Sequence, residues 1–164
     1  MRSLFLIAAT ALLLTGGALL AQETIALNTA QLSEGIPLRV DGAQLDNSAQ
    51  LIVRGGAGEN LALLALEPGD GEPVWLRQDN AGEVVANTAR WSFDPESGLL
   101  RVDLSGVKGR LGAGNTVTLR LIPVNFRRER LTLTLSASGD GFETAQPALN
   151  SLQTLTIDIN ETEQ

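Results

Sequence analysis

The sequence lacks the two residue types on which most enzyme active sites depend. The chain has 164 residues and contains no His and no Cys. Without His there is no imidazole base, no Ser-His-Asp triad and no His-ligated metal, and without Cys there is no thiolate nucleophile and no Cys-ligated zinc. Carboxylates, hydroxyls, Arg side chains and the single Lys108 remain. We therefore expect a protein that is not an enzyme and that needs no cofactor.

Two acidic turns offer a metal site as an alternative, with calcium as the ion. Asp70 and Glu72 lie in a turn rich in Gly and Pro, and Asp79 and Asn80 lie in the next turn. Carboxylate and amide oxygens are ligands that calcium prefers. Their spacing does not match the twelve-residue calcium loop, and Asp, Asn and Gly are also the usual residues of tight turns. We favour plain turns and keep calcium as the alternative.

One tryptophan has the sequence position of an exposed binding residue. Trp75 stands between Val74 and Leu76. If those two side chains point into the core of a strand, Trp75 points outward. Exposed Trp rings serve as anchors for protein partners and as flat platforms for sugars. The alternative is that Trp75 packs beneath a loop or faces a second apolar layer.

A basic cluster follows an expected strand near residue 122. Arg127, Arg128 and Arg130 lie beside Phe126. The guanidinium fork suits carboxylate and phosphate groups. The alternative is a solvated hairpin tip whose Arg side chains pair with neighbouring acids. Together with Trp75, these four residues form the predicted contact surface.

The charge balance narrows the class of partner. Twelve basic residues face nineteen acidic ones, which gives a net charge of −7. A chain of this charge is repelled by nucleic acid and by anionic lipid. We expect a protein partner, with a glycan as the alternative and no nucleic acid.

The N-terminal residues have the order of a secretory signal peptide. A short segment with Arg2 precedes a mostly apolar run over 4–21, and polar sequence begins at Gln22. This order is typical of export signals. We expect cleavage after Ala21 and a periplasmic or secreted protein. An uncleaved segment of this length would instead tether the protein to the membrane.

Apolar and polar residues alternate with a period of two along most of the remaining chain. This period predicts strands with one buried and one solvated face, as in antiparallel sheets. Residues 43–50 are compatible with one or two helical turns, and the apolar run at 61–66 is short enough for a buried strand. We expect nine or ten strands among eleven ranges: 24–28, 36–40, 50–54, 61–66, 73–77, 83–86, 89–94, 99–104, 116–122, 131–137 and 152–159.

One segment has the pattern of a tight hairpin. In Trp91-Ser92-Phe93-Asp94-Pro95-Glu96-Ser97-Gly98-Leu99-Leu100, Pro95 presets the first turn dihedral and Gly98 can adopt the positive φ of a bulged hairpin. These ten residues resemble a hairpin of cadherin-like and other bacterial immunoglobulin-like modules. The acidic calcium motifs between cadherin repeats are absent from the sequence. The resemblance implies an immunoglobulin-like fold.

The sequence thus predicts a signal peptide over 1–21 and one all-β domain over 22–164. We expect a two-sheet antiparallel β-sandwich, immunoglobulin-like or jelly-roll, with a small β-barrel as the alternative. The predicted function is an exported binding or assembly module of the cell envelope that contacts a protein partner through loops or edge strands. The alternatives are a carbohydrate-binding module that uses Trp75, and a structural subunit that assembles by pairing of an edge strand at 24–28 or 152–159.

Overall fold

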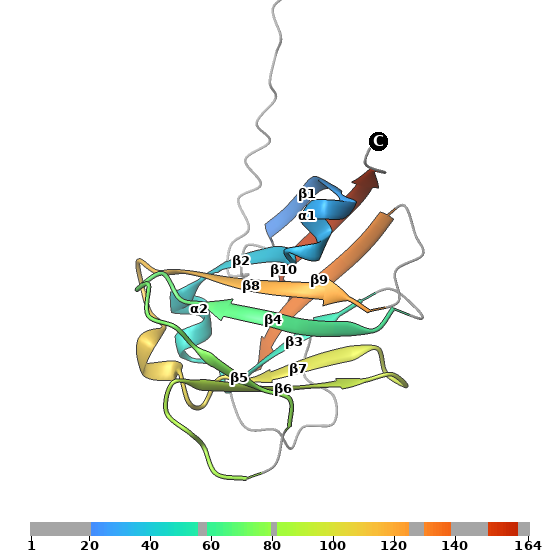
Figure 1. Ribbon diagram of the computed structural model, residues 1–164. Helices are drawn as coiled ribbons and strands as arrows, with labels where there is room; N and C mark the ends of the chain where they lie inside the picture. Colours follow the sequence, from blue (N-terminus) through green and yellow to red (C-terminus); the bar gives the residue numbers. More distant parts are fainter. Residues whose placement is uncertain (1–20, 56–58, 80–81, 125–129, 139–150, 161–164) are drawn as a thin grey trace, which may run out of the picture.

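Two β-sheets of unequal width pack face to face (Figure 1). The computed structural model describes residues 21–55, 59–79, 82–124, 130–138 and 151–160. The wider sheet has seven strands in the spatial order β1 (Ala21–Asn28), β10 (Ser151–Asn160), β9 (Arg130–Ser138), β3 (Gln50–Arg54), β7 (Leu99–Asp103), β6 (Thr88–Asp94) and β5 (Trp75–Arg77). The narrower sheet has three strands in the order β2 (Ile36–Asp41), β8 (Thr116–Pro123) and β4 (Leu61–Glu67).

The predicted all-β, two-sheet architecture is confirmed. Neighbouring strands are antiparallel except at the two edges of the wider sheet, where β1 runs parallel to β10 and β5 runs parallel to β6. Alternation along a strand does not encode the direction of its neighbour, so the sequence pattern could not predict these two parallel pairs.

The core lies between the sheets and is built from the inward-facing half of the alternating residues. On β2 and β8, Leu38 pairs with Leu119 in a register that stacks apolar side chains on one face. They belong to the same hydrophobic cluster as Leu51 of β3 and Leu133 of β9 from the wider sheet, and all four are fully buried. Burying one such side chain contributes about 1.5–3 kcal/mol to the stability of the fold.

Ten of the eleven expected ranges coincide with strands, and one expectation is wrong. Residues 83–86 form no strand, because β5 already occupies the position beside β6 and the segment turns into β6 through Asn87 at φ 57°. The expected strand at 73–77 is also shorter and begins at Trp75. Pro73 has no N–H to give to a ladder.

Short helices connect the first strands. The turn expected within 43–50 is α2 (Gly42–Asp46), and its N-cap Asp41 accepts a hydrogen bond from the Ala43 N–H at 2.9 Å. Helix α1 (Thr29–Ser33) was not expected from the hydrophobic pattern. Its sequence signal is the capping box formed by Asn28 and Gln31. A single 3₁₀ turn, η1 (Lys108–Arg110), follows β7.

The hairpin expected between β6 and β7 is confirmed. Gly98 has φ 69°, and its N–H donates to the Asp94 carbonyl at 2.9 Å. The Asp94 side chain accepts from the Ser97 hydroxyl and the Glu96 N–H, and these bonds lower the pKa of Asp94 below its ordinary value.

The expected signal peptide lies almost entirely outside the described part of the chain. Of the expected signal peptide over 1–21, the structure describes only Ala21, the first residue of β1. Among the described residues, no helix has the length and apolar character needed to cross a membrane.

Candidate binding surface

Trp75 projects from the edge of the wider sheet. It lies on β5, and 69% of its surface is exposed, whereas its neighbours Val74 and Leu76 are half-buried against the core. The expectation that Trp75 points outward is therefore confirmed. Its role in binding remains a prediction.

The backbone of Trp75 is held in place by a relay of hydrogen bonds. The Trp75 N–H donates to the Asn87 carbonyl at 2.8 Å, and the Asn87 N–H donates to the Gly106 carbonyl at 2.9 Å. A Cβ added at Gly106 would collide with the carbonyl oxygens of Val85 and Thr88. The absence of a side chain at Gly106 is therefore what lets the segment before β6 approach closely enough to hold β5.

A buried ion pair fixes the same segment to the sheet. Arg90 of β6 and Asp103 of β7 face each other in register, and their side chains pair at 2.6 Å. Arg90 also donates to the carbonyl of Gly82 at 2.7 Å. The guanidinium thus ties the start of the segment to the sheet, while Asn87 ties its end.

The segment before β6, which holds the Trp75 backbone through Asn87, carries two exposed apolar side chains. Val84 and Val85 are 57% and 46% exposed. We call Trp75, Val84 and Val85 the β5 edge patch. A protein surface that holds a Trp ring on a fixed backbone beside exposed aliphatic side chains has the composition of an interface anchor.

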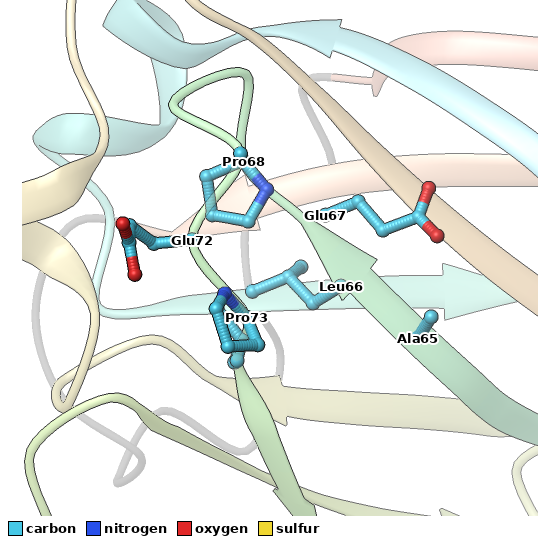
Figure 2. Close-up of a pocket in the computed structure, with 8 residues that line it drawn as sticks. Ala65, Leu66, Glu67, Pro68, Glu72 and Pro73 are labelled. Carbon is cyan, nitrogen blue, oxygen red and sulfur yellow. The ribbon is translucent and has the colours of Figure 1, made fainter.

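A groove lies between β4 and the segment that leads into β5 (Figure 2). It has a volume of about 440 Å³ and opens to solvent. Its lining comes from both limbs of one turn, namely Ala65, Leu66, Glu67 and Pro68 before the turn and Gly71, Glu72, Pro73 and Val74 after it. Trp75 directly follows the last lining residue, so the groove and the β5 edge patch adjoin along the chain.

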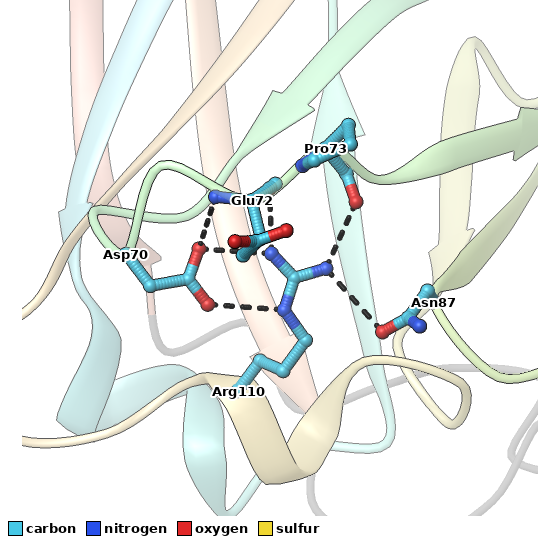
Figure 3. Close-up of polar contacts among 5 residues, drawn as sticks. All are labelled: Asp70, Glu72, Pro73, Asn87 and Arg110. Carbon is cyan, nitrogen blue, oxygen red and sulfur yellow. Dashed lines mark hydrogen bonds and ion pairs between the residues drawn. The ribbon is translucent and has the colours of Figure 1, made fainter.

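Arg110 of η1 holds the second limb of this turn (Figure 3). Its guanidinium contacts both oxygens of Asp70 at 2.8 and 3.0 Å and donates to the carbonyls of Glu72 and Pro73 at 2.5 and 3.0 Å. A longer contact of 3.5 Å reaches the Asn87 side chain. The Arg110 guanidinium lowers the pKa of Asp70 below its ordinary value, and Asp70 in turn raises the pKa of Arg110.

Two residues of the calcium alternative, Asp70 and Asp79, are engaged with guanidinium groups, whereas Glu72 contacts Arg110 through its backbone carbonyl. Asp70 pairs with Arg110, and Asp79 pairs with Arg77 at 2.7 Å. Asn80 lies outside the described residues. Within the described ranges, no three acidic residues gather closely enough to hold a metal ion.

The basic cluster is described only at its last residue. Phe126, Arg127 and Arg128 lie outside the described residues. Arg130 begins β9 and pairs with Asp158 of β10 at 2.6 Å, which raises its pKa. At this position the structure therefore shows the alternative interpretation, an Arg side chain paired with a neighbouring acid.

Sequence reasoning missed the residues that position the surface. Arg110 and Asp70 are separated by 40 positions, and Gly106 by 19 from Asn87. No local spacing rule connects such residues. The one local signal was Asn87, because Asn tolerates the left-handed backbone better than other residues with a side chain.

Comparison with known proteins gives no family for this chain. No family model matches it, and no curated protein matches its sequence. Among solved structures, it is similar to the cysteine protease inhibitor EhICP2 of Entamoeba histolytica, with 12% identity, TM-score 0.32, and coverage of 85% of this chain and 97% of the inhibitor. It is also similar to the sixth cohesin of Acetivibrio cellulolyticus scaffoldin B, solved with a mutant Cel5 dockerin, with 14% identity, TM-score 0.31, and coverage of 84% and 95%.

The glycine at 106 provides the first test of the relay. We expect Gly106→Ala to lower the free energy of unfolding by about 1–3 kcal/mol, because its methyl group overlaps two backbone oxygens. Gly109→Ala is the matched control, since nothing lies within 4 Å of its added Cβ, and it should change stability by less than about 0.5 kcal/mol. Urea unfolding measures both. Equal effects of the two substitutions would contradict the close approach at Gly106.

The clamp between Asp70 and Arg110 predicts a pH dependence. The lowered pKa of Asp70 means that its ion pair stabilises the folded state above the ordinary aspartate value of 3.8 and is lost as the pH falls through the lower folded value. Asp70→Asn should therefore be less stable than the wild type at pH 5–7, and the difference should shrink below about pH 4.

The matched control for this test removes the other partner. Arg110→Met should remove the same acid-dependent stability together with its bonds to the two carbonyls, and the double variant should lose little more than Arg110→Met alone. Urea unfolding at a series of pH values measures this coupling. A constant difference between wild type and Asp70→Asn down to pH 2 would exclude the clamp.

Proposed function

We propose that this chain is an exported, non-catalytic module that binds a protein partner through the β5 edge patch. The observation that carries the proposal is Trp75, the most exposed of the large apolar side chains in the described residues, on a strand that the relay through Asn87 holds in place. Export rests on the N-terminal sequence, and the absence of His and Cys supports a role without catalysis.

The energetics favour a macromolecular partner at this patch. Trp side chains bury about 150–250 Å² when an interface covers them, and they are enriched among residues that dominate binding energy. Because the backbone at Trp75 is already ordered, a partner that covers the ring has little backbone entropy to overcome. The ring contributes little to the stability of the monomer while it stays exposed.

The test begins with the tagged mature protein, which is used to capture its partner from the envelope fraction. The captured partner is then identified and purified. Its Kd is then measured against the wild type and two variants. Trp75→Ala should weaken binding about 30-fold or more, which corresponds to about 2 kcal/mol. Val124→Ala is the control, because Val124 is similarly exposed, at 60%, at the end of β8.

Two outcomes would contradict the proposal. The first is a partner whose affinity is unchanged by Trp75→Ala. The second is a protein that retains no partner but binds sugars on a glycan array in a Trp75-dependent manner, which would establish the carbohydrate-binding alternative. That alternative needs a second exposed ring near Trp75, and the described residues contain none.

Assembly by strand pairing is a second candidate, and β1 favours it. β1 lies at the edge of the wider sheet and pairs with β10 over eight residues without a bulge. It contains no Pro and no basic residue, so it lacks common features that protect an edge from further pairing. The other terminal segment, 152–159, lies inside the sheet between β1 and β9 and does not meet this requirement.

Light scattering at high protein concentration tests this candidate. If β1 pairs with a second copy, the wild type should form dimers, and Thr24→Lys on β1 should shift them to monomers. Ala30→Lys on the adjacent helix α1 is the control and should leave the dimers intact. A wild type that stays monomeric at millimolar concentration would exclude assembly through β1.

A further inference from the structure

The turn between β4 and β5 is a hairpin whose limbs have separated. The limbs belong to different sheets, since β4 is an edge of the narrower sheet and β5 is an edge of the wider one. The Gly71 N–H donates to the Pro68 carbonyl at 3.3 Å, but no backbone hydrogen bond joins 65–67 to 72–74 in the described residues. The groove occupies the space where a closed hairpin would have its ladder (Figure 2).

Arg110 prevents the second limb from closing on β4. The carbonyls of Glu72 and Pro73, which a closed hairpin could direct at β4, accept hydrogen bonds from the Arg110 guanidinium instead. Pro73 has no N–H to offer. The Arg110 side chain is only 18% exposed, so these bonds are partly shielded from water. The hydrogen bonds of Arg110 therefore keep the groove open in the folded protein.

The free edge of β4 forms the other wall. β4 pairs with β8 on one side only, so alternate residues direct their N–H and C=O groups away from β8. The register is interrupted between Leu63 and Ala65, which leaves a short regular edge at 65–67. These three residues also line the groove, so a strand that entered it would find backbone groups to pair with.

The walls carry negative charge. Glu67 and Glu72 lie on opposite limbs, and each side chain points away from the gap between the limbs, so the two carboxylates stand at the rim of the groove (Figure 2). Glu67 shares its charge with Arg120 at 3.2 Å, and Asp70 is neutralised by Arg110. The Glu72 carboxylate is exposed and also interacts electrostatically with Arg110, so three carboxylates share two guanidinium groups and leave a local excess of negative charge at the rim. A cationic group on the occupant fits this excess.

We infer that this groove binds an extended segment of the protein partner, which adds to the edge of β4 and carries a basic residue next to small apolar ones. This inference rests on the proposed function and assigns it a specific ligand chemistry. The exposed Pro73 ring and the half-buried Ala65 and Val74 suit small aliphatic side chains, and the Glu72 carboxylate at the rim suits a Lys or Arg. The volume of about 440 Å³ falls in the range of ligand sites, about 300–1,000 Å³. Trp75 stands at the end of the groove, where it contacts the rest of the same partner.

The experiment uses a displayed library of random heptapeptides. Selection is done on the wild-type mature protein, with counter-selection on Ala65→Phe, whose ring fills the groove. Enriched peptides should combine β-branched or small apolar residues with a Lys or Arg. Their binding should fall at least 10-fold on Ala65→Phe and should be unchanged on Leu64→Phe, since Leu64 lies on the same strand but does not line the groove.

A second variant tests the charge without changing the shape of the groove. Glu72→Gln should weaken the binding of the selected peptides about twofold to fivefold at low salt, and this loss of affinity should shrink at high salt. Amide shifts in NMR spectra of the wild type with the best peptide should concentrate at 65–67 and 71–74. Thermal unfolding of each variant verifies that the protein is folded.

The outcomes separate this inference from the proposed function. The inference is overturned if no peptide is enriched on the wild type relative to Ala65→Phe. It is also overturned if the selected peptides contain no basic residue. If the natural partner no longer binds Trp75→Ala but still binds Ala65→Phe and Glu72→Gln, the proposed function holds and the groove is not the site that binds the partner's segment. If the partner is lost on Ala65→Phe but not on Trp75→Ala, the groove is supported and the role of Trp75 is wrong.

Discussion

The unequal width of the two sheets is the constraint on which the rest of the structure depends. Three strands spaced by about 4.8 Å span about 10 Å, whereas seven span about 29 Å. The narrow sheet can therefore cover fully only the middle of the wide one. The fully buried side chains of the wide sheet belong mainly to its inner strands. At its edges, Ile25 and Leu27 of β1, Leu76 of β5 and Val74 just before β5 are half-buried.

The two edge strands of the wide sheet therefore need stabilising interactions other than burial between the sheets. At the β5 edge, this stabilisation is polar and comes from elements distant in sequence. Arg110 replaces the missing hairpin ladder with charge-assisted bonds to Asp70 and to two carbonyls, and the buried pair of Arg90 and Asp103 anchors the segment before β6. Bonds to a charged donor are roughly twice as strong as neutral ones, so a few of them can hold a three-residue strand in place.

The same constraint explains why the candidate binding features gather at one edge. A strand with a neighbour on only one side leaves backbone groups and one row of side chains without partners. On the β4 and β5 side, this leaves an open groove and the exposed ring of Trp75. A partner that adds a strand and covers the ring would complete both sheets at the place where the fold itself does not.

The sequence by itself determined the fold class, the ranges of ten strands and the β6–β7 hairpin, and it offered an outward Trp75 as one of two interpretations that the structure then decided. All of these follow from local rules: alternation places Val74 and Leu76 on one face, and Asp94 and Gly98 satisfy a turn within five residues. Only the tertiary structure decided the two parallel strand pairs, the groove and the clamp at Arg110. Arg110 and Asp70 lie 40 positions apart, and they meet where the turn after β4 takes the chain from the narrow sheet to β5 of the wide one. Hydrophobic alternation specifies which face of a strand is buried, but the pairing of charges across that distance depends on how the sheets pack.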